Sequence, residues 1–381
     1  MRVLLVAGAR PNFMKVAPVL AALRAAGDEA VLVHTGQHYD ARMSDAFFQD
    51  LALPEPDFHL GVGSGSHAAQ TARVMEAFEP VVREVKADWV VVVGDVNSTL
   101  ACALVAAKLR EEVGSRIAHV EAGLRSRDWR MPEEINRVLT DRLSDLLLIP
   151  SIDAIANLRA EGIPEERIAF VGNVMIDTLL GQLSAARSTG AVKRLGLDKG
   201  KYVVVTLHRP SNVDARETLA PILGALADLA REMPIVFPIH PRTQRNAEQF
   251  GLLPLLEALV ATEPLSYREM LGLTESAALV LTDSGGLQEE TTVLGVPCLT
   301  LREQTERPIT IVAGTNRLAE WPLTRDGIIA SAHAALSNGR PPSLAPVGWD
   351  GKAGERVARA LRLWLGDASC RPSAPDMLIE A

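Results

Sequence analysis

The stretch from Leu281 to Glu290, LTDSGGLQEE, places two glycines where an apolar strand is expected to lead into a helix. Gly285 and Gly286 have no Cβ, so a bulky anion could sit directly on the backbone beside Ser284. The first N–H groups of a helix lack intrahelical partners and carry the positive end of its dipole, which favours phosphate. Glu290, one turn beyond Gly286, could accept hydrogen bonds from sugar hydroxyls. Together these features indicate a nucleotide site; the alternative is an ordinary strand-to-helix turn.

Three carboxylates in the first half of the chain could transfer protons. Asp95 lies in VVVGDVNST, Glu121 in HVEAGLRS and Glu134 in MPEEINR. Asp95 could instead cap a helix and Glu134 could complement a helix dipole, whereas Glu121 ends an expected buried strand and has no such role. Carboxylates held close together repel, which raises at least one pKa and separates acid from base. Such a cluster suits inversion of a carbon centre, which takes a proton from one face and returns it to the other.

Basic and imidazole side chains are candidates for holding an anion. Arg10 and Lys15 lie in GARPNFMK, after the first expected strand, and Arg307 lies in ERPIT. His208 and His240 follow expected strands of the second half, and each could donate to a phosphate oxygen or carry a proton. The alternative for the basic residues is ordinary surface charge, and this alternative is strongest for Lys15. The alternative for the histidines is the ordering of a loop, and it is strongest for His240.

Short runs rich in Val, Ile and Leu alternate with longer helical patterns along the whole chain. The expected strands are Val3–Ala7, Ala30–Thr35, Trp89–Val93, Ile117–Val120, Leu146–Ile149, Tyr202–Thr206, Ile235–Ile239, Leu279–Thr282 and Pro297–Leu301. Because these runs are continuously apolar, they indicate strands buried on both faces, as in parallel sheets covered by helices. Such a series is too long for one compact sheet, so it predicts two doubly wound α/β domains with a cleft between them.

The polar candidates fall at the carboxyl ends of these expected strands, where open α/β sheets bind their ligands. We expect the first domain to span 1–175 and the second 176–351, because the stretch 180–201 is rich in small and polar residues and suits a joint. A last helical pattern, about 352–370, is expected to pack back on the first domain.

Composition restricts the class of protein. The 381 residues carry a net charge of −8, which disfavours nonspecific nucleic-acid binding and means that an anionic ligand needs a local basic pocket. No apolar run is long enough to cross a bilayer, and MRVLLVAGAR is typical of a first strand rather than a signal peptide, so we expect no membrane partner. Cys102, Cys298 and Cys370 lie far apart, as suits the reducing cytoplasm. There is no Walker A sequence, no HExxH and no GxGxxG after the first strand, so we expect neither a hydride cofactor nor a metal.

Eight segments occur in a fixed order between Val3 and about Leu318, namely GARPNFMKVAP, TGQHYD, GDVNSTLA, HVEAGLRS, PEEINR, GNVMIDTL, DSGGLQEE and TERPIT. In this order they resemble the non-hydrolysing UDP-N-acetylglucosamine 2-epimerases. The resemblance implies two Rossmann-like domains in the glycosyltransferase-B arrangement and reversible conversion of UDP-GlcNAc to UDP-ManNAc. The route proposed for that family eliminates UDP to give 2-acetamidoglucal and adds UDP back with protonation at C2 from the other face. The resemblance also implies that the protein needs no cofactor, forms a homodimer, and supplies ManNAc units for cell-surface polysaccharide.

Carried over position by position, the resemblance assigns roles to the candidate residues. Asp95, Glu121 and Glu134 match the acid/base carboxylates, and His208 matches a histidine near the diphosphate. Glu290 matches the ribose ligand. The positions that match diphosphate contacts are Arg10, Lys15, Ser284, Gly285, Gly286 and Arg307.

The sequence also departs from the family pattern. Asn12 stands where many members have glutamate, and HRPSNVD replaces a commoner HRREN-like turn. Many bacterial members bind a second, allosteric UDP-GlcNAc near a Gln-His pair. Gln37 and His38 keep that pair, but the Tyr39-Asp40 continuation differs, which weakens the implied allosteric role and leaves the catalytic assignment in place. Three alternatives stay open. They are a hydrolysing epimerase, which would release UDP and free ManNAc, a glycosyltransferase of the same architecture that uses a UDP-sugar, and a nucleotide-sugar sensor that binds without turnover.

Overall fold

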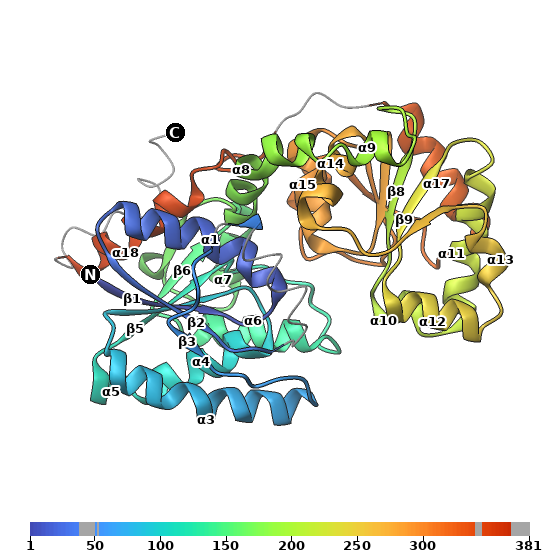
Figure 1. Ribbon diagram of the computed structural model, residues 1–381. Helices are drawn as coiled ribbons and strands as arrows, with labels where there is room; N and C mark the ends of the chain where they lie inside the picture. Colours follow the sequence, from blue (N-terminus) through green and yellow to red (C-terminus); the bar gives the residue numbers. More distant parts are fainter. Residues whose placement is uncertain (38–49, 52, 340–344, 367–381) are drawn as a thin grey trace. The chain divides into compact units, whose positions relative to one another are not determined.

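The computed structural model describes residues 1–37, 50–51, 53–339 and 345–366 (Figure 1). The chain divides into two compact units. Unit 1 comprises Met1–Gly181 and the segment that begins at Val347, and unit 2 comprises Gln182–Pro346. The first limit falls inside helix α8 (Val174–Ser188). This limit also lies inside the stretch 180–201, which the sequence indicated as a joint, whereas the exact boundaries after 175 and 351 stay predictions.

Unit 1 is built on a sheet of seven parallel strands. They are β1 (Arg2–Ala7), β2 (Glu29–His34), β3 (Phe58–His59), β4 (Trp89–Val93), β5 (Arg116–Val120), β6 (Leu146–Ile149) and β7 (Ile168–Phe170). They lie in the order β3-β2-β1-β4-β5-β6-β7, so the progress of the chain across the sheet reverses between β1 and β4. Helices α1 (Arg10–Ala25) and α18 (Ala353–Leu365) cover one face, and α3 (His67–Val85) and α4 (Asn97–Lys108) cover the other (Figure 1). The unit's other helices are α5 (Arg110–Val113), α6 (Pro132–Leu143), α7 (Asp153–Ala160) and the 3-10 turn Glu165–Arg167.

Unit 2 repeats this plan with six parallel strands. They are β8 (Val203–Thr206), β9 (Ile235–Pro238), β10 (Val260–Thr262), β11 (Leu279–Thr282), β12 (Cys298–Thr300) and β13 (Asn316–Leu318). Their order, β10-β9-β8-β11-β12-β13, reverses between β8 and β11. The helices are α9 (Ala191–Arg194), α10 (Pro210–Val213), α11 (Arg216–Leu229), α12 (Pro241–Gln249), α13 (Leu253–Leu256), α14 (Tyr267–Ser276), α15 (Gly285–Leu294), α16 (Ile309–Val312) and α17 (Arg325–Ser337).

Every strand expected from the sequence is present, and the prediction of two doubly wound α/β units is confirmed. The sequence missed β3, β7, β10 and β13, which are the edge strands of the two sheets. Each has only two or three residues and pairs on one side, so its apolar run is too short to stand out. The central strands carried the signal because they are buried on both faces, as β4 is along its whole length.

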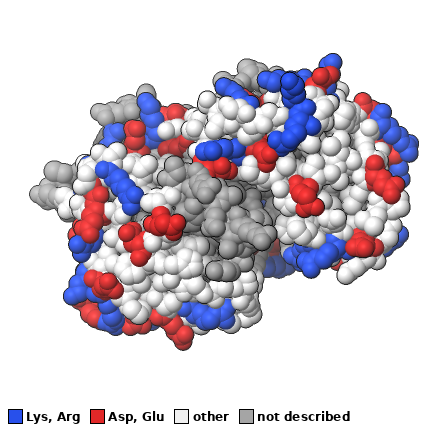
Figure 2. Space-filling model, in the orientation of Figure 1, with Lys and Arg blue, Asp and Glu red and all other residues white. Residues whose placement is uncertain are grey.

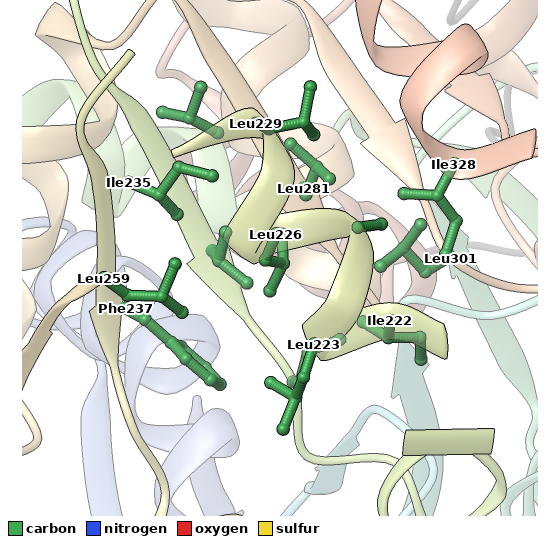
Figure 3. Close-up of a cluster of buried hydrophobic side chains, with 14 of the residues drawn as sticks. Ile222, Leu223, Leu226, Leu229, Ile235, Phe237, Leu259, Leu281, Leu301 and Ile328 are labelled. Atoms are coloured by element: carbon green, nitrogen blue, oxygen red, sulfur yellow. The ribbon is translucent and has the colours of Figure 1, made fainter. Parts of the chain in front are cut away.

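The hydrophobic core of unit 2 shows how helices cover these sheets. Ile222, Leu226 and Leu229 of α11 repeat at intervals of four and three residues, which places them on one face of the helix. They are buried against Phe237 of β9 and Leu281 of β11 (Figure 3). Burying a side chain of this size contributes about 1.5–3 kcal/mol, so the continuous apolar strands and the one-sided helix together hold the sheet.

Helix α18 packs on α1 within unit 1 and fixes the return of the chain. The carboxylate of Asp177 accepts hydrogen bonds from the backbone N–H groups of Ala353 (3.0 Å) and Gly354 (2.7 Å), which are unpaired at the start of the helix. The indole N–H of Trp89 donates to the carbonyl oxygen of Leu361 at 3.1 Å. The helix is therefore attached at its start and again near its end.

Charge on the face shown in Figure 2 is mixed, with basic and acidic residues interspersed. Within the described ranges, no helix has the length and apolar content needed to cross a membrane.

Gly354→Ala is expected to destabilise unit 1 although alanine is the better helix former. A Cβ at Gly354 would lie 2.6 Å from the carbonyl oxygen of Pro18, so the helices must move apart, at a cost of roughly 1–3 kcal/mol. The matched control is Gly181→Ala in α8, where no described atom lies within 4 Å of the added Cβ and the helix should gain about 0.5–1 kcal/mol. Denaturant unfolding of both variants measures the difference, and equal shifts would contradict the packing argument.

Candidate functional site

Several of the predicted site residues lie at the reversal point of each sheet. In unit 1, Lys15 lies in the helix that follows β1, and Asp95 follows β4. In unit 2, His208 follows β8 and Ser284 follows β11. The helices on either side of a reversal point run to opposite faces of the sheet and leave a gap at the strand ends, which is where doubly wound sheets bind ligands.

Glu121 follows β5 in a backbone conformation that favours glycine. Its φ is +71°, a left-handed value that costs a non-glycine residue about 1–3 kcal/mol and persists only where surrounding contacts impose it. Its Oε2 lies 2.5 Å from Nζ of Lys15, and both side chains are buried. A Cβ at Gly94 would lie 2.8 Å from the same Nζ, so Lys15 would have to shift, and the φ of +65° at this position itself favours glycine. Lys15 is therefore an internal cation beside Glu121 and the Asp95 turn; the surface-charge alternative is wrong.

Arg137 joins the other two carboxylates. Its Nη1 donates to Oε2 of Glu134 at 2.7 Å, and its Nη2 donates to the carboxylate of Asp95. Glu134, which is buried, also accepts from the backbone N–H groups of Ser126 (2.9 Å) and Arg127 (2.7 Å). The sequence interpretation treated the carboxylates as repelling neighbours and overlooked these cations. The signal was present, because Arg137 follows Glu134 by three residues and so lies on the same helical face.

Asn12 ties the two central strands of unit 1 together. Its Oδ1 accepts from the backbone N–H groups of Gly8 (3.1 Å) and Ala9 (3.0 Å), and its Nδ2 donates to the carbonyl oxygen of Val93 at 3.1 Å. A glutamate side chain at this position would have no N–H group to donate to the carbonyl oxygen of Val93. The departure from the family pattern at this position therefore has a structural role at the end of β4.

The other predicted residues of unit 1 are Gln37, His38 and Arg10. Gln37 is buried, and its Oε1 accepts from the backbone N–H (3.0 Å) and the hydroxyl (2.8 Å) of Ser98. Its predicted partner, His38, lies outside the described residues. Arg10 is the first residue of α1, and its side chain lies outside the part of the chain that the structure describes. The allosteric role of the Gln37–His38 pair stays a prediction.

His208 is oriented by Asp283, a residue the sequence analysis did not select. Nδ1 of His208 lies 2.8 Å from Oδ1 of Asp283, which is fully buried at the end of β11. Asp283 also accepts from the backbone N–H of Arg209 at 2.9 Å and from Nδ2 of Asn212 at 3.2 Å. Burial alone would raise the pKa of Asp283, but the His208 side chain and the backbone N–H groups of Arg209 and His208 lower it below its usual value. The imidazole is thus held by an ionised carboxylate and is itself about half exposed, 46%, as a group that meets a ligand must be.

The glycine pair opens helix α15, as the sequence indicated. Ser284 is its N-cap residue, and the backbone N–H of Ser284 donates to the hydroxyl of Thr282 at 2.9 Å. A Cβ at Gly285 would lie 2.6 Å from Nη1 of Arg307, so the guanidinium rests against the bare backbone of the first helical residue. Gly286 follows as the second residue of the helix and is half-buried. The helix start and an arginine therefore meet at one point, a combination that favours an anion.

Two further arginines reach the same place. Oε1 of Glu306 lies 2.8 Å from Nη1 of Arg307 and 3.8 Å from Nη2 of Arg209, and its Oε2 lies 2.8 Å from Nη1 of Arg302. Arg307 also pairs with Glu289 through Nε at 2.9 Å. Three guanidiniums therefore lie around Glu306 and Glu289 near the start of α15, where they can offer N–H donors to an anionic ligand.

Glu290 lies on α15 as expected but has a partner inside the unit. Its Oε1 accepts from the hydroxyl of Tyr267 at 3.1 Å, and the carboxyl is buried. Burial raises the pKa of Glu290 to about 7, with Tyr267 acting to lower it and the charge of Glu289 acting to raise it. A carboxyl that changes charge near neutral pH is a good acceptor for ligand hydroxyls only when it is ionised.

His240 has a local role. It is exposed, serves as the N-cap residue of α12, and accepts from the backbone N–H of Arg242 through Nδ1 at 3.2 Å. This is the loop-ordering alternative that the sequence left open. Its contact with a ligand stays a prediction.

Taken separately, the two units offer different chemistry. Unit 1 presents three carboxylates, each beside a cation, which suits proton transfer. Unit 2 presents a helix start, three arginines and a carboxylate-held imidazole, which suits a phosphate. Within the part of the chain that the structure describes, no group of three or more His, Cys, Asp or Glu side chains could hold a metal ion.

The chain matches the family model for UDP-N-acetylglucosamine 2-epimerase over residues 21–362. It is 41% identical to the UDP-N-acetylglucosamine 2-epimerase of Methanocaldococcus jannaschii, with 95% of this chain and 99% of that protein covered. The UDP-2,3-diacetamido-2,3-dideoxy-D-glucuronate 2-epimerase of Pseudomonas aeruginosa is 42% identical, with 88% of this chain and 92% of that protein covered. The crystal structure of the M. jannaschii enzyme in complex with UDP-GlcNAc and UDP is similar with a TM-score of 0.86 at 40% identity, over 95% of this chain and 99% of that chain.

Glu290→Gln is expected to flatten the pH dependence of unit 2 stability. The folded carboxyl holds its proton up to about pH 7, whereas an unfolded glutamate releases it near its usual value of 4.5. The free energy of unfolding therefore falls as pH rises from 4.5 to 7, by roughly 3 kcal/mol at about 1.4 kcal/mol per pKa unit. Urea unfolding at pH 5 and 7.5 measures this fall. The control is Glu257→Gln, an exposed residue of the same unit, which should keep the wild-type dependence; an unchanged fall in Glu290→Gln would contradict the assignment.

Proposed function

Because the chain belongs to the UDP-N-acetylglucosamine 2-epimerase family, we propose that it interconverts UDP-GlcNAc and UDP-ManNAc by inverting C2 without hydrolysing the nucleotide. The observation that carries the proposal is the buried Glu121, held in a left-handed conformation at a strand end with Nζ of Lys15 2.5 Å away. A strained, charged residue is kept in a folded protein only where other contacts support it, and it commonly marks a functional site.

Elimination explains how C2 can be inverted without a redox cofactor. The C2 proton of the sugar is not beside a carbonyl group, so its direct removal is very unfavourable. When UDP leaves C1, the electron pair of the C2–H bond forms the C1=C2 double bond of 2-acetamidoglucal, the proton goes to the enzyme, and UDP takes the electrons of the C1–O bond. Returning UDP to C1 and a proton to the opposite face of C2 completes the inversion.

The carboxylates of unit 1 are assigned to the proton transfers as a group. Glu121 with Lys15, and Asp95 with Glu134 around Arg137, supply two separate places where a proton can be taken up or given back. Lys15 places a positive charge beside Glu121, and the resemblance assigns the same lysine to the diphosphate, whose negative charge increases as UDP leaves.

Unit 2 is assigned to the leaving group. The start of α15, with Ser284 and Gly285 beside Arg307, is placed to hold the diphosphate, and His208 donates to it from its fixed position on Asp283. Glu290 accepts from the ribose hydroxyls when it is ionised. Favourable contacts with the nucleotide then contribute to lowering the barrier for cleavage of the C1–O bond.

A modified sugar is the second candidate substrate. The Pseudomonas aeruginosa relative named for UDP-2,3-diacetamido-2,3-dideoxy-D-glucuronate is about as similar to this chain as the Methanocaldococcus jannaschii relative named for UDP-N-acetylglucosamine. The elimination route is the same for both sugars, because it involves only C1 and C2. Comparing kcat/KM for the two UDP-sugars decides between them.

The remaining expectations follow from the family resemblance. We propose a cytoplasmic homodimer that supplies ManNAc units for cell-surface polysaccharide. Sedimentation of the purified chain tests the dimer.

Wild-type protein incubated with UDP-GlcNAc in D₂O should produce UDP-ManNAc at an equilibrium ratio, with deuterium at C2 of both sugars. The solvent deuteron replaces the C2 proton because the proton taken by the enzyme exchanges before it is returned. Proton NMR follows both signals in one sample. Accumulation of UDP and free ManNAc would instead indicate a hydrolysing enzyme, and an unchanged C2 proton would indicate binding without turnover.

Glu121→Gln should abolish exchange at C2 and leave UDP binding nearly intact. The amide keeps the shape but cannot take a proton, and general acid–base catalysis typically contributes 10²–10⁴-fold. We expect exchange to fall by at least about 10²-fold while the Kd for UDP, measured by calorimetry, changes less than about twofold. The matched control is Glu133→Gln, the neighbour of Glu134 on α6 to which no role is assigned. Deuterium incorporation at the wild-type rate in Glu121→Gln would refute the assignment.

A further inference from the structure

A buried ionic cluster behind the carboxylates of unit 1 takes no direct part in the proposed chemistry. Oδ1 of Asp141 lies 2.6 Å from Nδ1 of His119, and Nε2 of His119 lies 2.7 Å from the carbonyl oxygen of Gly94. Oδ2 of Asp141 accepts from the backbone N–H of Gly123 at 3.0 Å and lies 2.8 Å from Nη2 of Arg125. His119 and Asp141 are completely buried, so no ligand can reach them without unfolding.

Two contacts of the cluster, those with Gly94 and Gly123, end beside a proposed catalytic carboxylate. Gly94 directly precedes Asp95, and Gly123 follows Glu121 by two residues. Asp141 itself lies on α6, two turns beyond Glu134. One carboxylate thus connects the turn after β4, the turn after β5 and the helix between β5 and β6.

The turn after β5 needs such support. Glu121 and Gly123 both have left-handed backbones, with φ of +71° and +81°. A Cβ at Gly123 would lie 2.8 Å from the Cβ of Ala154, so the turn is also pressed against α7. The hydrogen bond from Gly123 to Asp141 holds the strained segment in place, and strain of this kind relaxes when such contacts are removed.

The hydrogen-bond donors of the cluster converge on Asp141. A carbonyl oxygen only accepts, so Nε2 of His119 donates to Gly94, and Nδ1 faces the carboxylate. Burial alone would raise the pKa of Asp141, but His119 and Arg125 lower it below its usual value. Arg125 has a second partner in Glu161, with Nε to Oε1 and Nη2 to Oε2 both at 2.7 Å, which extends the cluster away from the carboxylate turns.

We propose that Asp141 is a positioning residue that sets the Glu121 turn and, through His119, the Asp95 turn in register with Glu134 on α6. It acts through these contacts and not on the substrate. The inference rests on the proposed epimerase function, since it concerns where the proton-transferring groups are held. A displacement of about 1 Å in such groups costs on the order of 10²-fold in rate, without equal loss of binding by parts of the site elsewhere.

Asp141→Ala removes all the contacts and should lower kcat per folded site on the order of 10²-fold, with KM for UDP-GlcNAc within about threefold. Folded sites are counted by calorimetric titration with UDP, so a loss of folded protein is not mistaken for a loss of kcat. Asp141→Asn is the conservative variant. The Oδ1 atom of the new asparagine can accept from Gly123 and Arg125, and its Nδ2 can donate to Nδ1 of a neutral His119. That histidine still donates to Gly94 through Nε2. Because the positions of both turns are kept, kcat should fall less than about tenfold.

Two further variants complete the test. His119→Phe keeps the ring but cuts the link to Gly94, and it should lower kcat with little change in KM, which carries the test if Asp141→Ala does not fold. Glu161→Gln, the control, disturbs the outer side of the same cluster and should lower stability without lowering kcat.

A wild-type kcat in folded Asp141→Ala or in His119→Phe would overturn the inference. An Asp141→Asn variant as slow as Asp141→Ala would also overturn it, because the charge of Asp141 and not the position of the turns would then determine kcat. Absence of UDP-ManNAc formation by the wild type would be a failure of the proposed function instead.

Discussion

Burial of the central strands on both faces is the constraint on which the site depends. Every residue of β4 is buried, and the strands of both sheets are parallel. A polar side chain inside such a strand would lose its hydration without a partner, so polar chemistry is restricted to the strand ends. Reversal of the strand order, between β1 and β4 in one unit and between β8 and β11 in the other, then selects which ends have room for a ligand.

Charges at these ends are close to the core and need partners of their own. Leaving a buried charge without its partner costs several kcal/mol, and the carboxylates of the site follow this rule. Glu121 pairs with Lys15, Glu134 with Arg137, and Asp283 with His208. Within each unit the charges therefore form matched pairs whose geometry is set by the fold, which suits catalysis by fixed charges.

The sequence revealed the strands, the glycine turn and the carboxylates because each has a local signature. Asp95, Glu121 and Ser284 stand directly after apolar runs, and the strand ends of a parallel sheet must come together. Edge strands such as β10 lacked that signature, being short and paired on one side. Pairing across long sequence distances also leaves no local signature. Lys15 was interpreted as surface charge because its partner, Glu121, is more than a hundred residues away in the sequence. Asp141 has no local signature either, because its partners His119 and Gly123 come close to it only when α6 packs beside β5 and the turn that follows.

The two units share one strand order and differ in what their strand ends carry. Carboxylates dominate at the ends of unit 1 and arginines at the start of α15 in unit 2, and this separation suits an elimination. In unit 1 each carboxylate keeps a cation beside it, and in unit 2 the arginines keep carboxylates beside them, so each set is balanced within its own unit. One set can then exchange a proton while the other holds the leaving group. The left-handed backbone at Glu121 adds a cost of about 1–3 kcal/mol that folding alone does not require, and the contacts around it, from Lys15 to Asp141, offset that cost.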